Sequence, residues 1–165
     1  GQVAQREAAR DDGLDDLLPV ELGRRLLLLE HVVVVEGPDV TLGLGADAVV
    51  AADTDSLAVR ATTDNRDLNG YTADRLSVAL GSVESLQEQL NGRRADLLLC
   101  NILAPVIEAL APSFESLLAK EGRALLSGLL VDQAPRLKQV LGDLGWMVTA
   151  SAEQGRWGLL EIRRA

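Results

Sequence analysis

Two polar residues, Asp53 and Asn101, each stand at the end of an apolar run that predicts a strand. The run before Asp53, residues 48–52, has no polar alternation, which is typical of a strand covered on both faces in a parallel sheet. Ligands of open α/β folds bind outside the carboxyl ends of such strands. Asp53 is therefore a candidate ligand-binding residue, whereas Asn101 taken alone is more typical of a turn at a strand end.

The carboxylate of Asp53 has chemistry suited to a sugar. It offers two acceptor oxygens and no donor, so it could hold both hydroxyls of a nucleoside ribose. The alternative is a capping role at the helix predicted over residues 55–69, for which Asp55 or Ser56 is also well placed. A single acid after a strand is a weak form of the dinucleotide-binding fingerprint, so both interpretations stay open.

The composition excludes several classes of function. The chain has 165 residues, enough for one domain with a hydrophobic core. Its net charge of −9 argues against a nucleic-acid-binding surface, which needs a basic stripe. Cys100, the one cysteine, lies in an apolar run and predicts a buried structural thiol rather than a nucleophile. His31, the one histidine, has no partner at metal-ligand spacing, so we expect no metal site.

No segment predicts a membrane span or an exported protein. The longest apolar runs are too short to cross a bilayer, and the N-terminus is polar and acidic, unlike a signal peptide. We therefore expect a cytoplasmic protein without membrane partners. The sequence makes no prediction of the oligomeric state.

Strands alternate with helices from about residue 31 onward, which is the pattern of a doubly wound, mostly parallel sheet. The last two strands are joined by a short polar turn and must be antiparallel neighbours. The pattern thus predicts an α/β, Rossmann-like fold with a terminal antiparallel hairpin. The predicted strands cover residues 31–36, 48–52, 75–80, 96–102, 123–127, 146–150 and 157–162, and the predicted helices cover residues 17–30, 55–69, 83–90, 104–120 and 131–144.

Four segments resemble the ribosomal protein L-eleven methyltransferase family, which has the class I methyltransferase layout: residues 49–70, 95–104, 122–134 and 155–160. They occur in the family's order, and the match covers roughly residues 42–165. Two runs are more specific than generic methyltransferase features. These are Asn-Ile-Leu-Ala, which begins at Asn101, and Leu-Ser-Gly-Leu-Leu, which begins at Leu126.

The resemblance implies transfer of a methyl group from S-adenosylmethionine to amino groups, of lysine or of an N-terminus, on a large-subunit ribosomal protein. It implies that Asp53, with the adjacent Thr54, holds the cofactor ribose, and that Gly81 and Ser82 lie by the adenine. Asn101 would lie between the methionine end of the cofactor and the incoming amine. A carboxamide suits this place, because it can accept an amine N–H without stabilising an ammonium as a carboxylate would. No direct contact with nucleic acid is implied.

Two family features are absent from the sequence. The glycine-rich cofactor loop is expected near residues 33–37, where only Glu36-Gly37-Pro38 stands, so the first βα unit is predicted to be truncated or rewritten. Residues 1–41 also lack the family's upstream Gly-Thr-Gly segment. We therefore predict a divergent N-terminal helical segment over residues 1–30 and a Rossmann-like methyltransferase domain over residues 31–165.

The missing loop leaves a second interpretation open. In it, the chain is a catalytically impaired or inactive remnant of the family that acts as a non-enzymatic binding domain. A nucleotide-binding oxidoreductase fits poorly, because the phosphate-binding glycine fingerprint of that class is absent as well.

Overall fold

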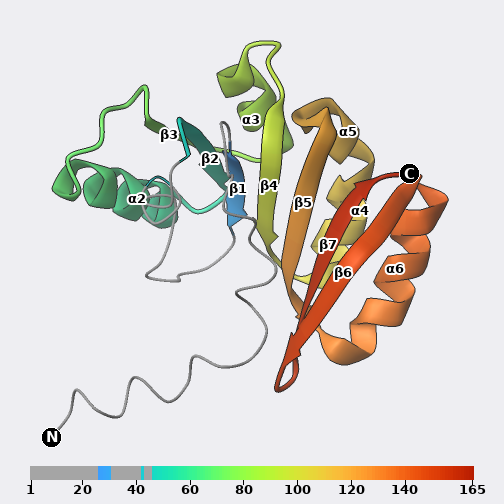
Figure 1. The fold of residues 1–165 in the computed structure, drawn as a ribbon. Coiled ribbons are helices and arrows are strands. Elements are labelled where there is room, and N and C mark those ends of the chain that lie inside the picture. The colour runs from blue at the N-terminus through green and yellow to red at the C-terminus, as the bar shows by residue number, and fades with distance from the viewer. Residues whose placement is uncertain (1–25, 31–41, 43–45) are drawn as a thin grey trace, which may run out of the picture.

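A seven-stranded sheet of order β3-β2-β1-β4-β5-β7-β6 forms the centre of the protein (Figure 1). The computed structural model describes residues 26–30, 42 and 46–165. The strands are β1 (Leu26–Glu30), β2 (Val49–Asp53), β3 (Leu76–Leu80), β4 (Ala95–Asn101), β5 (Leu118–Leu130), β6 (Trp146–Gln154) and β7 (Trp157–Arg164).

The direction of the strands confirms the predicted fold class. Strands β1 to β5 pair in parallel, whereas β7 is antiparallel to both of its neighbours, β5 and β6. Short connections can join only antiparallel neighbours, and the turn between β6 and β7 obeys this rule. The fold is therefore an open, mostly parallel sheet that ends in an antiparallel hairpin.

Helices α4 (Ala104–Leu110), α5 (Phe114–Leu117) and α6 (Ala134–Asp143) lie behind β5, β7 and β6 in Figure 1, and α2 (Ser56–Leu68) lies at the opposite end of the sheet. Helix α3 (Val83–Leu90) contributes to the same core as α4 to α6. This core fills the space between these helices and one face of the sheet, and its members include Leu86, Leu98, Cys100, Ile107, Phe114, Leu126, Leu137, Leu141, Leu160 and Ile162.

The opposite face of the sheet carries a smaller buried cluster of Leu42, Ala46, Val49, Leu76 and Leu97. Successive side chains of a strand point to opposite faces, so Leu97 and Leu98 of β4 enter different clusters. Burial of both faces explains why the central strands have continuous apolar sequences rather than alternating ones.

The first strand differs from its prediction. Residues 26–30 form β1, so the predicted helix over 17–30 is wrong at its carboxyl end. Periodicity cannot distinguish a helix from a buried strand within a short run such as Leu26-Leu-Leu-Leu29. In the structure these residues form a strand, because they pair with β2 on one side and with β4 on the other. The predicted strand at 31–36 and the rest of the predicted helix lie outside the described residues, and the boundary of the N-terminal segment stays a prediction.

The helix predicted over residues 104–120 is also wrong in part. It ends as α4 at Leu110, a 3₁₀ turn with Pro112 follows, and α5 ends at Leu117. Proline removes a helical hydrogen bond and clashes with the preceding turn, which explains the break. Strand β5 then begins at Leu118, earlier than the predicted residue 123, because Leu118 pairs with Ala95 of β4.

We expect Leu126→Ala to lower the free energy of unfolding by about 2–5 kcal/mol, because it leaves a cavity in the main core. The side chain of Leu126 is fully buried. The matched control is Leu68→Ala, since Leu68 is 83% exposed and its loss should cost less than about 0.5 kcal/mol. Denaturant unfolding measures both values, and equal values for the two variants would contradict the core described above.

Candidate functional site

The register of the sheet brings the carboxyl ends of its parallel strands to one edge. Glu30 pairs with Asn101, Asn101 pairs with Ser127, and Asp53 pairs with Leu80. One strand, β1, separates β2 from β4. With about 4.8 Å between neighbouring strands, the backbones at Asp53 and Asn101 lie roughly 10 Å apart along this edge.

Asp53 ends β2 as predicted and is buried, with 6% of its surface exposed. Its Oδ1 accepts a hydrogen bond from the backbone N–H of Asp55 at 2.7 Å. A carboxylate has two oxygens and about four acceptor positions, so it can accept hydrogen bonds from more than one donor at once. Asp53 therefore fits the predicted role of a ribose acceptor.

The cap of the next helix is a different residue. Asp55 is the N-cap of α2, and its side chain accepts from the backbone N–H of Leu57 at 2.8 Å. Of the two caps predicted for this helix, Asp55 is correct and Ser56 is not. Because Asp55 fills the capping position, Asp53 is not needed as the cap. The intervening Thr54 is exposed at the tip of the turn.

The predicted adenine-side residues are adjacent to Asp53. The backbone N–H of Gly81 donates to the backbone carbonyl of Asp53 at 2.9 Å. Gly81 has a φ of +142°, a conformation that side chains rarely adopt. Ser82 follows as the N-cap of α3 and makes no side-chain capping bond. The turn after β3 thus lies against the tip of β2.

Asn101 ends β4 and is half-buried. Its Oδ1 accepts a hydrogen bond from the hydroxyl of Ser127, with 3.1 Å between the oxygens. The backbone N–H of Ile102 donates to the Ser127 carbonyl at 3.2 Å, which continues the β4–β5 pairing past the strand end. No local pattern marks Ser127 as a site residue, although it lies in the Leu-Ser-Gly-Leu-Leu run that carries the family resemblance.

Gly128 allows β4 and β5 to approach closely at Asn101. Its φ is +77°. A Cβ added there would lie 2.7 Å from the Ile102 carbonyl oxygen, 2.9 Å from the Ile102 nitrogen and 3.0 Å from Asn101 Oδ1. Two of these atoms belong to the backbone of Ile102 and cannot move without distorting the strand, so only glycine fits next to Asn101.

Cys100 precedes Asn101 but is buried in the main core. Burial raises the pKa of its thiol to about 12, because the apolar surroundings disfavour a thiolate. The neutral form of a thiol is a poor nucleophile, which supports the prediction of a structural cysteine.

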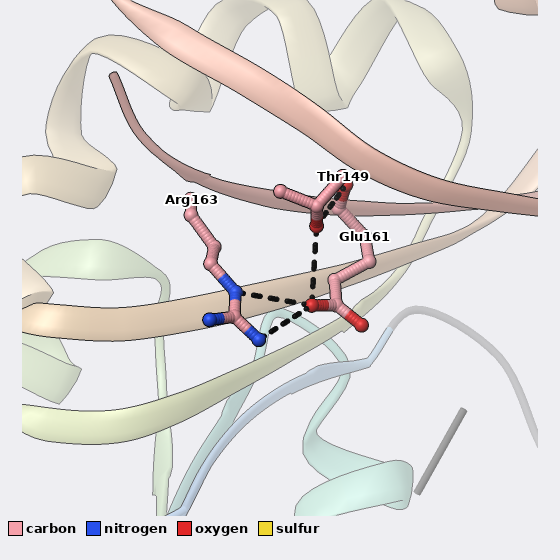
Figure 2. Close-up of polar contacts among 3 residues, drawn as sticks. All are labelled: Thr149, Glu161 and Arg163. Carbon is pink, nitrogen blue, oxygen red and sulfur yellow. Dashed lines mark hydrogen bonds and ion pairs between the residues drawn. The ribbon is translucent and has the colours of Figure 1, made fainter. Parts of the chain in front are cut away.

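Glu161 of β7, the other buried acid among the described residues, belongs to a separate cluster (Figure 2). Its Oε1 accepts from the hydroxyl of Thr149 at 3.1 Å and from Nε and Nη2 of Arg163, each at 3.2 Å. The Arg163 charge offsets the cost of burying the carboxylate. We therefore interpret this cluster as a structural ion pair within β7, to which Thr149 of β6 adds a hydrogen bond.

Residues 46–165, with residues 26–30 and 42, contain no group of three or more His, Cys, Asp or Glu placed to hold a metal ion. None of the helices in the described part of the chain is long and apolar enough to cross a membrane.

The strand order and the antiparallel hairpin define a Rossmann-like fold of the class I methyltransferase type. Asp53, Asn101 and Ser127 form a polar edge where the parallel strands of this fold end. Solved structures share it. A ribosomal protein L11 methylase from Lactobacillus delbrueckii subsp. bulgaricus has a TM-score of 0.71 at 24% identity over 85% of this chain and 69% of its own. A fibrillarin pre-rRNA processing protein from Methanococcus jannaschii has a TM-score of 0.68 at 13% identity over 89% of this chain and 69% of its own.

The chain belongs to the ribosomal protein L11 methyltransferase (PrmA) family, whose profile matches residues 40–165. A relative of that name from Parasynechococcus marenigrum is 81% identical over 123 residues, which are 74% of this chain and 43% of the relative. Another from Synechococcus sp. is 61% identical over 125 residues, 76% of this chain and 41% of the relative. The chain therefore spans about two fifths of the length of these curated relatives.

We expect Gly128→Ala to destabilise the protein more than Gly70→Ala does. Gly70 has a similar φ of +72° but nothing within 4 Å of an added Cβ, so its substitution costs only the backbone strain of about 1–2 kcal/mol. Gly128→Ala adds a backbone clash of about 1–3 kcal/mol. Denaturant unfolding of both variants gives the difference, and equal losses would show that β4 and β5 do not need this close approach.

The raised pKa of Cys100 predicts a pH-dependent stability. The unfolded thiol has a pKa of ~8.5, so its stabilising contribution is full below that pH. It is lost as the pH rises toward about 12, because only the unfolded state then releases the proton. We expect unfolding free energy to fall more steeply above pH ~8.5 in wild type than in Cys100→Ala. Identical slopes would contradict the burial of the thiol.

Proposed function

We propose that this chain binds S-adenosylmethionine and transfers its methyl group to amino groups of ribosomal protein L11. The substrate is inferred from the names of the relatives, and the reaction is inferred from the polar residues at the edge of the sheet. The observation that carries the proposal is the placement of Asp53 and Asn101 on one edge, level with each other and separated by β1 alone. Such an edge suits a ligand whose sugar and reacting ends lie several ångströms apart.

The cofactor fits the residues at the tips of β2 and β3. Asp53 would accept the ribose hydroxyls, since it ends β2 at the edge of the sheet and its carboxylate offers two acceptor oxygens and no donor. Thr54 would border the ribose, and Gly81 and Ser82 would border the adenine, because their turn is bonded to the tip of β2. When bound, the cofactor supplies an activated methyl group on a sulfonium.

Asn101 would orient the amine. Its Oδ1 can accept an amine N–H and leave the nitrogen lone pair directed at the methyl carbon. The methyl group would pass from the cofactor's sulfonium to the nitrogen that Asn101 holds, with the cofactor leaving as a neutral thioether, and the extra proton on nitrogen would pass to water. Holding the amine in line provides most of the rate, because proximity and alignment replace a bimolecular encounter.

The further details of the proposal follow from the family. The modified group would be a lysine or an N-terminal amine, the reaction would take place in the cytoplasm, and the chain would contact neither nucleic acid nor a membrane. The methyltransferase domain would include β1 and so would begin at or before Leu26, earlier than the predicted residue 31, and the residues before it would be the divergent N-terminal segment. The contribution of residues 31–41 to the cofactor pocket lies outside the described residues.

Calorimetric titration with S-adenosylmethionine tests the proposal. We expect measurable binding that Asp53→Ala weakens by about ten- to a hundredfold, because hydrogen bonds to a charged acceptor contribute about 1.5–3 kcal/mol. The control is Asp55→Asn, which removes a neighbouring charge and keeps a good helix cap, and should bind like wild type.

No binding by wild type up to millimolar cofactor would overturn the proposal and support the non-catalytic remnant. Equal weakening by both variants would show that local charge, rather than a ribose contact of Asp53, governs affinity.

A further inference from the structure

The hydroxyl of Ser127 is hydrogen-bonded to the carboxamide oxygen of Asn101. The two residues pair in register, Asn101 at the end of β4 and Ser127 within β5, and the hydroxyl donates to Oδ1 at 3.1 Å. The terminal torsion of asparagine is broad and roughly two-fold, so the carboxamide has no strong orientation of its own. A hydrogen bond to its oxygen therefore selects one range of that torsion.

Ser127 is itself held firmly. Its carbonyl accepts the Ile102 N–H at 3.2 Å, immediately beyond the Asn101 position. Because Gly128 has no Cβ, the backbone of β5 can lie close to Ile102 and to Oδ1 of Asn101 without a clash. The hydroxyl is thus a fixed donor on a strand rather than a group on a loose loop.

We propose that Ser127 is a positioning residue for methyl transfer, which acts by orienting the Asn101 carboxamide toward the incoming amine. This inference rests on the proposed function of Asn101. The carboxamide oxygen has two lone pairs, of which Ser127 occupies one and leaves the other for an amine N–H.

The chemistry explains why the orientation matters. If the carboxamide turns its NH₂ toward the substrate, that group donates to the amine and occupies the lone pair that must attack the methyl carbon. Such a complex binds substrate but does not react. Loss of the Ser127 hydroxyl should therefore lower kcat while KM for the cofactor stays unchanged.

The kinetic test uses methyl transfer from S-adenosylmethionine to purified ribosomal protein L11. We expect Ser127→Ala to lower kcat about three- to tenfold, the loss that one net hydrogen bond implies, and Ser127→Thr to restore it. The matched control is Ser77→Ala. Ser77 also lies on a strand, and its hydroxyl donates to a side-chain amide oxygen, Gln89 Oε1, at 2.6 Å. This substitution should leave kcat unchanged.

A spectroscopic test separates this inference from the proposed function. The carboxamide carbon resonance of Asn101, assigned by its absence in Asn101→Ala, should shift upfield in Ser127→Ala and stay in place in Ser77→Ala. An unmoved resonance in Ser127→Ala overturns the inference whatever the activity. A moved resonance with unchanged kcat overturns the positioning role alone. A moved resonance in a chain that transfers no methyl group overturns the proposed function and the role of Ser127 with it.

Discussion

The pairing of β1 with β2 on one side and β4 on the other is the constraint on which the site depends. It fixes the distance between the tips of β2 and β4, and its register makes them level. A slip of one residue would move every side chain of a strand to the other face of the sheet. The polar edge is therefore a product of backbone hydrogen bonds made along the whole length of three strands.

At the end of β4, two consecutive residues have different roles: one packs in the core and the other lies at the candidate site. Cys100 belongs to the large apolar core, whereas the next residue, Asn101, is half-buried at the edge and bonded to Ser127. Alternation along a strand places such neighbours on opposite faces. Both faces of β4 are thus packed in apolar clusters, and the polar group at its tip is positioned by these buried residues.

Local patterns predicted most of the fold, because the alternation of elements indicated the sheet and its hairpin. Asp53 was predicted as a site residue because it follows an apolar run, and Asn101 because of the family resemblance; the structure places both at the same edge of the sheet. The strand β1 was missed because consecutive leucines suit a helix and a buried strand equally. The early start of β5 and the roles of Ser127 and Gly128 were missed because they depend on pairing between strands, which leaves no local signal.

The position of β7 has a consequence for the order of folding during synthesis. Strand β7 lies between β5 and β6, although it is made after both. Until residues 157–164 leave the ribosome, β6 has no neighbour and β5 presents an unpaired edge. The nascent chain therefore carries an open, aggregation-prone edge that β7 closes, so the sheet is complete only after β7 has left the ribosome.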